Sequence, residues 1–402
     1  MTKRMQIIIL VMSLLISSLT PVCAQAQASA DTITPEQQQL LWQQEDFVKA
    51  YLVVAEPCGA LYSIFGHACL HLVCEAYNLD YFFTYESENA AQKVWQFVKG
   101  DLKMGMAAVT AEEYLSDYKA EGRGVFEYEL NLPIDIKREL WRVLDNHVME
   151  GMYLPYDFEA RGCAYACTKM LDEALRDTRI AFGPWEEANY RTRREMCYDK
   201  GHRDYPWNMM FIMALVGTEV DKKLAPKDKL IIPTELAEVW QKAKVNGEQL
   251  LSTEAIELAP SVSTPSKTYF TPNMAAIVLL LLTIIGWLLK TPYADWLILT
   301  IVTLVGALIT YLVLLSSLPC TGWNWLIIPF NILPAIAWKW RKYWTLPYAG
   351  ILVIWMIAMI APTHRLVDPS MLILTAAWVI VLVKNALPLQ KKINRNLNTK
   401  KI

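Results

Sequence analysis

The sequence has almost no net charge, because its 38 lysines and arginines nearly balance its 40 aspartates and glutamates and leave −2 at pH 7. It also lacks a basic patch, an internal repeat and a low-complexity tract. Proteins that bind nucleic acid carry a surplus of lysine and arginine where they meet the phosphates. We therefore expect no nucleic-acid partner.

Acidic residues are also missing from the most apolar part of the chain. Five apolar blocks near the C-terminus each approach the ~20 residues that a helix needs to cross a bilayer; they are Met274–Leu289, Trp296–Leu315, Trp323–Trp338, Leu346–Ala361 and Met371–Leu387. The one lysine inside a block, Lys384, lies close enough to its end to extend to water. This composition predicts a membrane anchor and a lipid-facing platform rather than an ion or proton pathway.

The number of blocks predicts the topology. We expect an all-α membrane domain of about five transmembrane helices at residues 273–388. Asn331 and Pro334 interrupt the third block, which predicts a re-entrant or kinked segment there. An odd number of spans after an exported N-terminus places the C-terminus in the cytoplasm. The basic tail at residues 389–402 and the basic loop around Arg341 then lie inside, as the positive-inside rule requires.

The first residues predict export. Residues 1–26 combine Lys3 and Arg4 with a short apolar run and a small-residue cleavage pattern at Ala26, which is typical of a cleaved secretory signal. Lipidation of Cys23 is a weaker alternative, because valine is a poor residue directly before a lipidated cysteine. We therefore expect an inner-membrane protein of several spans, whose N-terminal domain lies in the periplasm.

That periplasmic domain is expected at residues 27–250, with a Ser/Thr/Pro-rich linker at residues 251–272. Its helical and strand-like stretches are mixed rather than alternating, which favours an α+β domain with a small antiparallel sheet. The expected strands are "YLVVAEPC", "SIFGHACLHLVC", "LDYFFTYES" and "GVFEYELNL". The expected helices include "AEEYLSDYKA", "IDIKRELWRVLDNHVME", "CAYACTKMLDEALRD", "WNMMFIMALVG" and "TELAEVWQKAKV".

Two histidines and a thiol stand in the stretch "SIFGHACLHL", where a buried strand normally carries valine or isoleucine. On a strand, His67, Cys69 and His71 point to one face, and the intervening Ala68 and Leu70 to the other. The glycine before His67 allows a backbone or a ligand to come close. A buried histidine that is merely satisfied by hydrogen bonds is the structural alternative.

A second cysteine favours a catalytic interpretation. Cys163 follows the turn residue Gly162 and begins an apolar-periodic helix at Ala164, so its sulfur is expected at the positive end of the helix dipole, among free backbone N–H groups. These conditions favour the thiolate. With His67 within reach, the two side chains form a thiolate–imidazolium pair that can attack an acyl carbonyl. His67 precedes Cys163, the reverse of the order in papain-like proteases, which fits a circularly permuted papain-like domain.

A third group should orient the imidazole. Asp80 and Tyr85 on the next strand and His71 on the same strand are candidates, and the sequence does not choose among them. Ser63 and Cys167 are secondary candidates, the latter as an alternative nucleophile one helical turn from the N-terminal amides.

Two other uses of the cysteines stay open. The periplasmic domain holds six cysteines, an even number in an oxidising compartment, so disulfides are an alternative; the six are Cys58, Cys69, Cys74, Cys163, Cys167 and Cys197. A zinc site of His67, His71, Cys163 and Cys167 has a plausible ligand set. The two histidines are, however, separated by roughly 13 Å along a strand, which is awkward for one tetrahedral metal. We expect neither a metal nor a cofactor.

Three motifs resemble a known family. They are "YSIFGHACLHL", the pattern Y-x-F-x-x-x-G-C-A from Tyr156 to Ala164, and "LVGTEVDKKLAPKDKLIIPTELAEVW". With the C-terminal blocks, including "TGWNWLIIPFNILP", they resemble Bacteroidetes membrane proteins that carry the Lnb N-terminal periplasmic domain, relatives of lipoprotein N-acyltransferases.

The resemblance implies a function. Cys163 would accept an acyl chain from a membrane phospholipid, with His67 as its base, and pass it to the N-terminal amine of a diacylglyceryl lipoprotein. Many relatives have asparagine directly before the cysteine, where this chain has Gly162. An oxyanion would then depend on backbone N–H groups such as those of Cys163 and Ala164. A membrane-anchored cysteine peptidase or amidase of the cell envelope, and a non-catalytic disulfide-stabilised binding module, are the alternatives.

Overall fold

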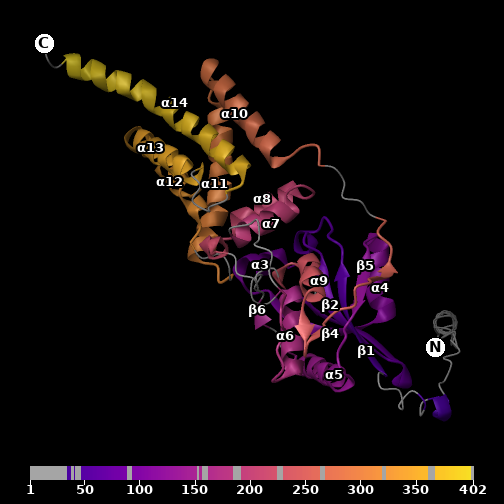
Figure 1. Ribbon diagram of the computed structural model, residues 1–402. Coiled ribbons are helices and arrows are strands. Elements are labelled where there is room, and N and C mark those ends of the chain that lie inside the picture. The colour runs from indigo at the N-terminus through magenta and orange to yellow at the C-terminus, as the bar shows by residue number, and fades with distance from the viewer. Residues whose placement is uncertain are drawn as a thin grey trace, which may run out of the picture. The chain divides into compact units, whose positions relative to one another are not determined.

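The computed structural model describes residues 34–37, 40, 47–87, 93–151, 154–155, 162–183, 192–223, 230–262, 268–318, 323–360 and 367–399 (Figure 1). The chain divides into two compact units, Met1–Gln44 and Glu45–Ile402. The predicted signal peptide and Tyr156 of the second motif lie outside the described residues. All features below belong to the second unit.

One antiparallel sheet organises the N-terminal part of this unit. Its strands lie in the order β6-β4-β3-β2-β1-β5-β9, so β2, which carries the histidine motif, is central. Their bounds are β1 Val48–Ala55, β2 His67–Cys74, β3 Leu79–Glu86, β4 Lys103–Thr110, β5 Val125–Glu129, β6 Leu154–Pro155 and β9 Ile256–Ala259. A separate short hairpin pairs β7 Lys244–Val245 with β8 Glu248–Gln249.

Helices cover both faces of the sheet. On one face, Leu70 and Leu72 of β2 pack against an apolar core that includes Leu144, Leu171 and Trp240 from three helices, α5 Ile134–Met149, α6 Cys163–Leu175 and α9 Pro233–Gln241. On the other face, Cys69 packs with Phe82 of β3 and Tyr114 of α4 Ala111–Glu121. The two faces alternate along β2 as the sequence predicts. The remaining helices are α3 Val94–Lys99, α7 Arg193–Gly201 and α8 Pro206–Leu215.

The α+β class is confirmed, and five short or weakly marked strands were not predicted, among them β4 and β9. The β4 sequence, KMGMAAVT, is rich in methionine, alanine and glycine, which are poor strand signals. Strand β9 lies inside the predicted linker and pairs with β5 at the edge of the sheet. The N-terminal sheet therefore includes residues beyond 250.

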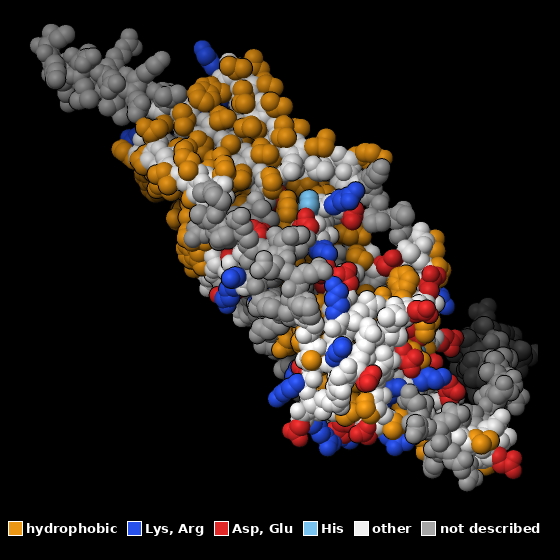
Figure 2. Space-filling model, viewed as in Figure 1, with side chains coloured by type: hydrophobic (Ala, Val, Ile, Leu, Met, Phe, Trp, Pro, Cys, Tyr) orange, Lys and Arg blue, Asp and Glu red, His pale blue; other side chains and the backbone are white. Residues whose placement is uncertain are grey.

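The C-terminal part is helical, with α10 Pro272–Leu288, α11 Tyr293–Leu314, α12 Leu333–Ala337, α13 Arg341–Ile360 and α14 Pro369–Thr399. Within the described residues, three helical stretches are long and apolar enough to cross a membrane, Tyr293–Leu314, Leu333–Ile360 and Pro369–Ala386, and the apolar α10 is shorter. Apolar side chains dominate the surface of these helices in Figure 2. Exposed examples on α10 are Ile277, Leu281 and Ile285.

The predicted third block is not one continuous helix. Residues 323–340, here called the broken segment, form a 3₁₀ turn at Trp325–Ile327, then α12, then a second 3₁₀ turn at Trp338–Trp340. The amide of Asn331 donates to the carbonyl oxygens of Ile327 and Ile328, which satisfies backbone groups that a helix would otherwise have paired.

The broken segment nevertheless runs along two full-length helices. The backbone of Asn331 lies against Gly306 in α11, and Trp338 packs against Trp296 near the start of that helix. On α13, Trp355 Nε1 donates to the Trp325 carbonyl at 3.1 Å, and Trp344 Nε1 donates to the Ala337 carbonyl at 3.0 Å. The broken segment is therefore antiparallel to both helices.

Lys384 does not extend to water as expected. Its ammonium group lies 2.8 Å from Oδ1 of Asp295 and also donates to the carbonyl oxygens of Gly286 and Thr291, and Asp295 is buried. These contacts join α14 to the α10–α11 connection, so the ion pair holds helices together.

Candidate active site

Cys163 is the first residue of α6, and the preceding Gly162 is in an extended conformation without a side-chain cap. The backbone N–H groups at this helix end are therefore free to bind another acceptor. Those of Cys163 and Ala164, together with the N–H of Ala68 in β2, lower the pKa of the Cys163 thiol, so the sulfur lies beside the helix end and the start of β2. Cys163 as a residue is partly exposed, although its thiol is largely desolvated.

The effect of the Ala68 N–H on the thiol pKa indicates that the thiol lies next to His67. Strand N–H groups lie in the plane of the sheet, so a sulfur beside this one lies between the two faces, at the end where β2 begins. Gly66, directly before the strand, has φ +86°, and a side chain there would lie 2.5 Å from the Ala55 carbonyl oxygen. Only glycine fits this close approach, which starts β2 at His67.

The His67 ring is held by Thr84 on the neighbouring strand. Nε2 of His67 lies 2.7 Å from Oγ1 of Thr84, which is buried. A ring that donates from Nε2 to this hydroxyl keeps a lone pair on Nδ1 and can accept the thiol proton there. Among the described residues, no hydrogen bond joins the Cys163 sulfur to the His67 ring. The two groups are therefore neighbours that are not hydrogen-bonded in the free protein.

A buried guanidinium lies near both groups. Arg123 follows α4, and its Nε and Nη2 donate to the Glu56 carbonyl oxygen at 2.8 and 2.6 Å, while Nη1 lies 3.0 Å from the Glu121 carboxylate. Its charge lowers the pKa of His67 and of Cys163. It therefore favours a neutral ring and an anionic sulfur or oxygen in the site.

Burial decides the resting protonation state. Desolvation, and then the charge of Arg123, lower the pKa of His67 to about 4. Desolvation raises the pKa of the Cys163 thiol despite the opposing effects of three N–H groups and Arg123. The free protein therefore holds a neutral thiol and a neutral imidazole at pH 7. This corrects the expected resting thiolate–imidazolium pair, because the helix end alone does not offset the loss of hydration.

Asp80 and His71 are hydrogen-bonded to each other rather than to His67. Nε2 of His71 lies 2.7 Å from Oδ1 of Asp80, and Nδ1 lies 2.7 Å from Oε2 of the buried Glu127. The His71 ring also stacks on Phe82, with ring centroids 4.1 Å apart. His71 is thus part of a separate buried cluster, and Asp80 does not orient the His67 ring.

The other expected residues lie around the site without touching the His67 ring in any described hydrogen bond. Tyr85 packs with Met104 and Ala166 on the α6 face of the sheet. Ser63 is buried in a turn, and its backbone carbonyl accepts hydrogen bonds from the N–H groups of Cys58 and Gly66. Cys167 lies in the apolar core, and burial raises its thiol pKa well above the usual value. Burial therefore argues against Cys167 as the nucleophile.

Sequence reasoning missed Thr84, Arg123 and the Ala68 amide. The β2–β3 register pairs Cys69 with Thr84, which makes Thr84 the diagonal neighbour of His67 across the strands, just as Asp80 is the diagonal neighbour of His71. The turn at Glu75–Tyr77 fixes this register, and it was the only available signal for Thr84. Arg123 stands between two glycines with no pattern that indicates its role.

All six cysteines of the described periplasmic region are free. Among the described residues, no group of three or more histidines, cysteines and acids has a geometry that could hold a metal. The four residues considered for zinc are thus divided, with His71 bound to two carboxylates and Cys167 in the core.

Comparison with known proteins found a family that matches the N-terminal part of the chain. No curated protein and no solved structure matches the chain. Residues 38–193, which contain His67, Thr84, Arg123 and Cys163, match the family described as the Lnb N-terminal periplasmic domain. That description and the three apolar helices fit a membrane protein with a periplasmic N-terminal domain. The chain therefore carries an Lnb N-terminal periplasmic domain.

Proposed function

We propose that the protein is a periplasm-facing membrane acyltransferase that moves a fatty acyl chain from a phospholipid, through a thioester on Cys163, to the N-terminal amine of a diacylglyceryl lipoprotein. The observation that carries the proposal is the position of Cys163 at the start of α6, with its thiol beside the N–H of Ala68 and thus next to His67 at the start of β2. The family description supports the periplasmic, membrane-associated setting.

In the first half-reaction, the sulfur of Cys163 attacks an ester carbonyl of the phospholipid while Nδ1 of His67 takes the thiol proton. The N–H groups of Ala68, Cys163 and Ala164, which lower the pKa of the thiol in the free protein, can donate to the oxyanion as it forms. This replaces the side-chain amide that relatives carry in place of Gly162. The C–O bond then breaks, His67 returns the proton to the leaving alkoxide, and a lysophospholipid departs.

In the second half-reaction, the neutral N-terminal amine of the lipoprotein attacks the thioester carbonyl. His67 accepts the amine proton as the C–N bond forms and transfers it to the sulfur as the C–S bond breaks. The products are an N-acyl lipoprotein and the free thiol, so the protein returns to its starting state without a cofactor. When the Thr84 hydroxyl accepts from Nε2, the ring has the tautomer with a free Nδ1 that both halves need.

The order of the two residues supports a circularly permuted papain-like arrangement. His67 begins a central strand and Cys163 begins a helix that packs on the same strand, so the base precedes the nucleophile in sequence. We include this permutation in the proposal. We also propose that the protein lies in the inner membrane and that its C-terminus is in the cytoplasm.

Lipoprotein N-termini test the proposal. In cells without another N-acyltransferase, we expect N-acylated lipoproteins with the wild-type chain and none with Cys163→Ala or His67→Ala, measured by mass spectrometry of the N-terminal peptides. Cys58→Ala, which removes another partly exposed thiol, serves as the matched control and should retain N-acylation. Full N-acylation with either active-site variant rejects the proposal. Cleavage of cell-wall peptides by purified protein, without lysophospholipid release, would favour the peptidase alternative.

A further inference from the structure

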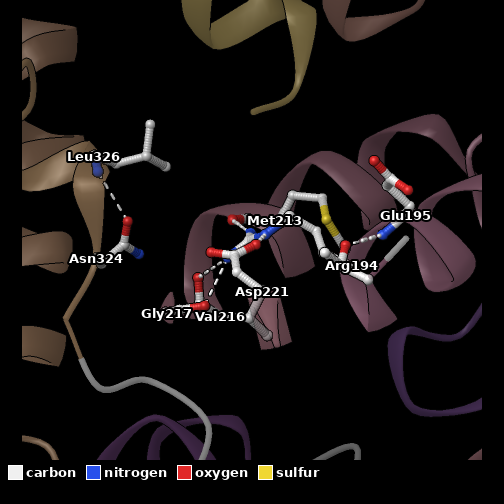
Figure 3. Close-up of polar contacts among 9 residues, drawn as sticks. Arg194, Glu195, Met213, Val216, Gly217, Asp221, Asn324 and Leu326 are labelled. Atoms are coloured by element: carbon white, nitrogen blue, oxygen red, sulfur yellow. Dashed lines mark hydrogen bonds and ion pairs between the residues drawn. The ribbon is translucent and has the colours of Figure 1, made fainter. Parts of the chain in front are cut away.

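Two helices of the periplasmic domain are built into the apolar core of the membrane helices. Val98 of α3 and Leu215 of α8 belong to one buried apolar cluster with residues of α11, α13 and α14. Ser316, just after α11, donates to the Val98 carbonyl at 2.6 Å, and Asn324 of the broken segment donates to the Ala214 carbonyl at 2.8 Å. Figure 3 shows Asn324 together with the end of α8.

A buried arginine fixes the end of α8 at this junction. Arg194 of α7 donates to the carbonyl oxygens of Met213, Val216 and Gly217 and lies 2.6 Å from Oδ1 of Asp221 (Figure 3). These bonds satisfy carbonyl groups at the C-terminal end of a helix whose sequence is apolar on all sides, PWNMMFIMAL. The position of α8 is therefore determined by these polar contacts and by the burial of Met209, Met213 and Leu215, while Trp207 stays exposed.

Both helices also present a tryptophan outward where the chain enters the apolar helices. Trp95 of α3 is 58% exposed and stacks on Tyr311 in the last turn of α11, with ring centroids 5.2 Å apart. Trp207 of α8 is 39% exposed, and its Nε1 donates to the carbonyl of Phe270, two residues before α10, at 2.7 Å. Exposed tryptophan is characteristic of the membrane–water interface, where its ring is apolar and its N–H stays wet.

We propose that α3 and α8 lie in the periplasmic leaflet of the bilayer and that their outward side chains bind glycerophospholipid directly. The apolar surface continues without a change of character onto α10, whose exposed side chains include Met274, Ile277, Val278 and Leu281. Continuity with the lipid-facing helices selects phospholipid as the occupant, because a soluble partner would have to displace the bilayer from the same surface.

This position brings lipid close to the catalytic residues. Asn208, next to Trp207, donates from Nδ2 to the Gly59 carbonyl at 2.9 Å, and Gly59 lies in the loop that leads into His67. The helix that carries Trp207 therefore contacts the loop that leads into His67. The use of this lipid as acyl donor rests on the proposed function. Its binding rests only on the contacts that α3 and α8 make with the apolar C-terminal helices.

Photocrosslinking in nanodiscs tests the proposal with the full chain. A benzophenone amino acid replaces Trp95 or Trp207, and the bilayer consists of phosphatidylethanolamine and phosphatidylglycerol. Leu281 on α10 is the membrane-facing positive control. Met149 at the end of α5, which is 85% exposed and whose helix packs on α6, β1 and β4, is the matched negative control.

We expect phospholipid adducts, measured by intact mass, at Trp95 and Trp207 at least ~5-fold above those at Met149, as for groups at the bilayer interface. Yields at the Met149 level at either tryptophan overturn the proposal. The same measurement in a Cys163→Ala background separates it from the proposed function, because lipid binding does not need turnover and its yields should not change.

Discussion

At the residue scale, the site is a neutral thiol beside a neutral imidazole. The low pKa of His67 and the raised pKa of Cys163 have one cause, burial, and the charge of Arg123 partly offsets it for the thiol. Proton transfer from sulfur to ring is therefore unfavourable until a substrate carbonyl accepts the developing charge. Such a thiol is protected from non-specific oxidation in the periplasm.

The pH profile of acyl transfer follows from these two pKa directions. The active form needs a neutral His67, so we expect the acid limb of kcat/KM near pH 4 and a plateau through pH 7. The unfolded histidine has the ordinary higher pKa and binds its proton first, so this group's contribution to stability is present above pH ~6.5 and is lost as the pH falls toward 4. An acid limb between pH 6 and 7 in a phospholipid-release assay would contradict the neutral pair.

Thr84 is a positioning residue that can be tested by an isosteric change. Thr84→Val removes the hydroxyl from Nε2 of His67 without a large change in volume. We expect kcat to fall by roughly 10- to 100-fold, less than the roughly 10²- to 10⁴-fold that a general acid–base group itself contributes, because Thr84 only positions the ring. KM should change little, and Thr84→Ser should restore most of kcat because it keeps the hydroxyl. Equal losses in the valine and serine variants would assign Thr84 a packing role instead.

Substitution of the two histidines of β2 should have different effects: loss of His71 should lower stability, and loss of His67 should abolish activity. His71→Ala leaves the buried Glu127 without its partner, and breaking such a buried pair typically costs about 3–5 kcal/mol. His67→Ala should cost much less stability and abolish acyl transfer. Thermal unfolding and activity, measured on both variants, check this division; a His71 variant that is stable but inactive would contradict it.

At the element scale, the sequence was informative where one pattern determines one structure. The alternation of β2 predicted which side chains share a face, and the glycine turn before Cys163 predicted a helix that begins at the thiol. The expected partner of His67 was wrong because it depends on the strand register, which the turn at Glu75–Tyr77 sets. Protonation could not be predicted either, since burial of the thiol depends on the assembled domain.

The broken segment shows the same limit in the membrane part. Its apolar composition predicted a crossing, and Asn331 and Pro334 predicted the interruption. The close packing against α11 could not be foreseen, because it depends on Gly306 in another helix. Long-range contact of this kind leaves no local pattern in the sequence.

Gly306 provides a test of that packing. A methyl group there would lie 2.6 Å from the Asn331 backbone nitrogen, so Gly306→Ala must displace the broken segment, and we expect a loss of about 1–3 kcal/mol of stability, as for other overpacked cores. Gly350→Ala in α13 is the matched control, since nothing lies within 4 Å of the added methyl group. Thermal unfolding in detergent should distinguish the two variants; similar behaviour would show that the segment is free to move.

At the scale of the whole molecule, the broken segment determines the topology. Three helical stretches are long enough to cross a membrane, and we propose that α10 and the broken segment cross as well, which would place the C-terminus in the cytoplasm when the N-terminal domain is periplasmic. A C-terminal green fluorescent protein should therefore fluoresce, and a C-terminal alkaline phosphatase should be inactive. The reverse result would mean that the broken segment turns back to the side from which it entered.

The proposed reaction explains why one chain combines a catalytic domain with membrane helices. The acyl donor and the acceptor are both lipids in the proposed reaction, and α3 and α8 join the catalytic domain to the lipid-facing helices through buried contacts. A soluble domain on a long tether would have to extract each lipid from the bilayer, at the cost of exposing its acyl chains to water.

The most direct test of the account is the mass of the Cys163 peptide after purified full-length protein meets phospholipid without an acceptor. We predict one acyl group on Cys163, labile to hydroxylamine, with one lysophospholipid released for each adduct. The adduct should be absent in His67→Ala. No adduct, or an adduct on Cys58 or Cys167 in its place, would contradict the assignment of Cys163 as the nucleophile.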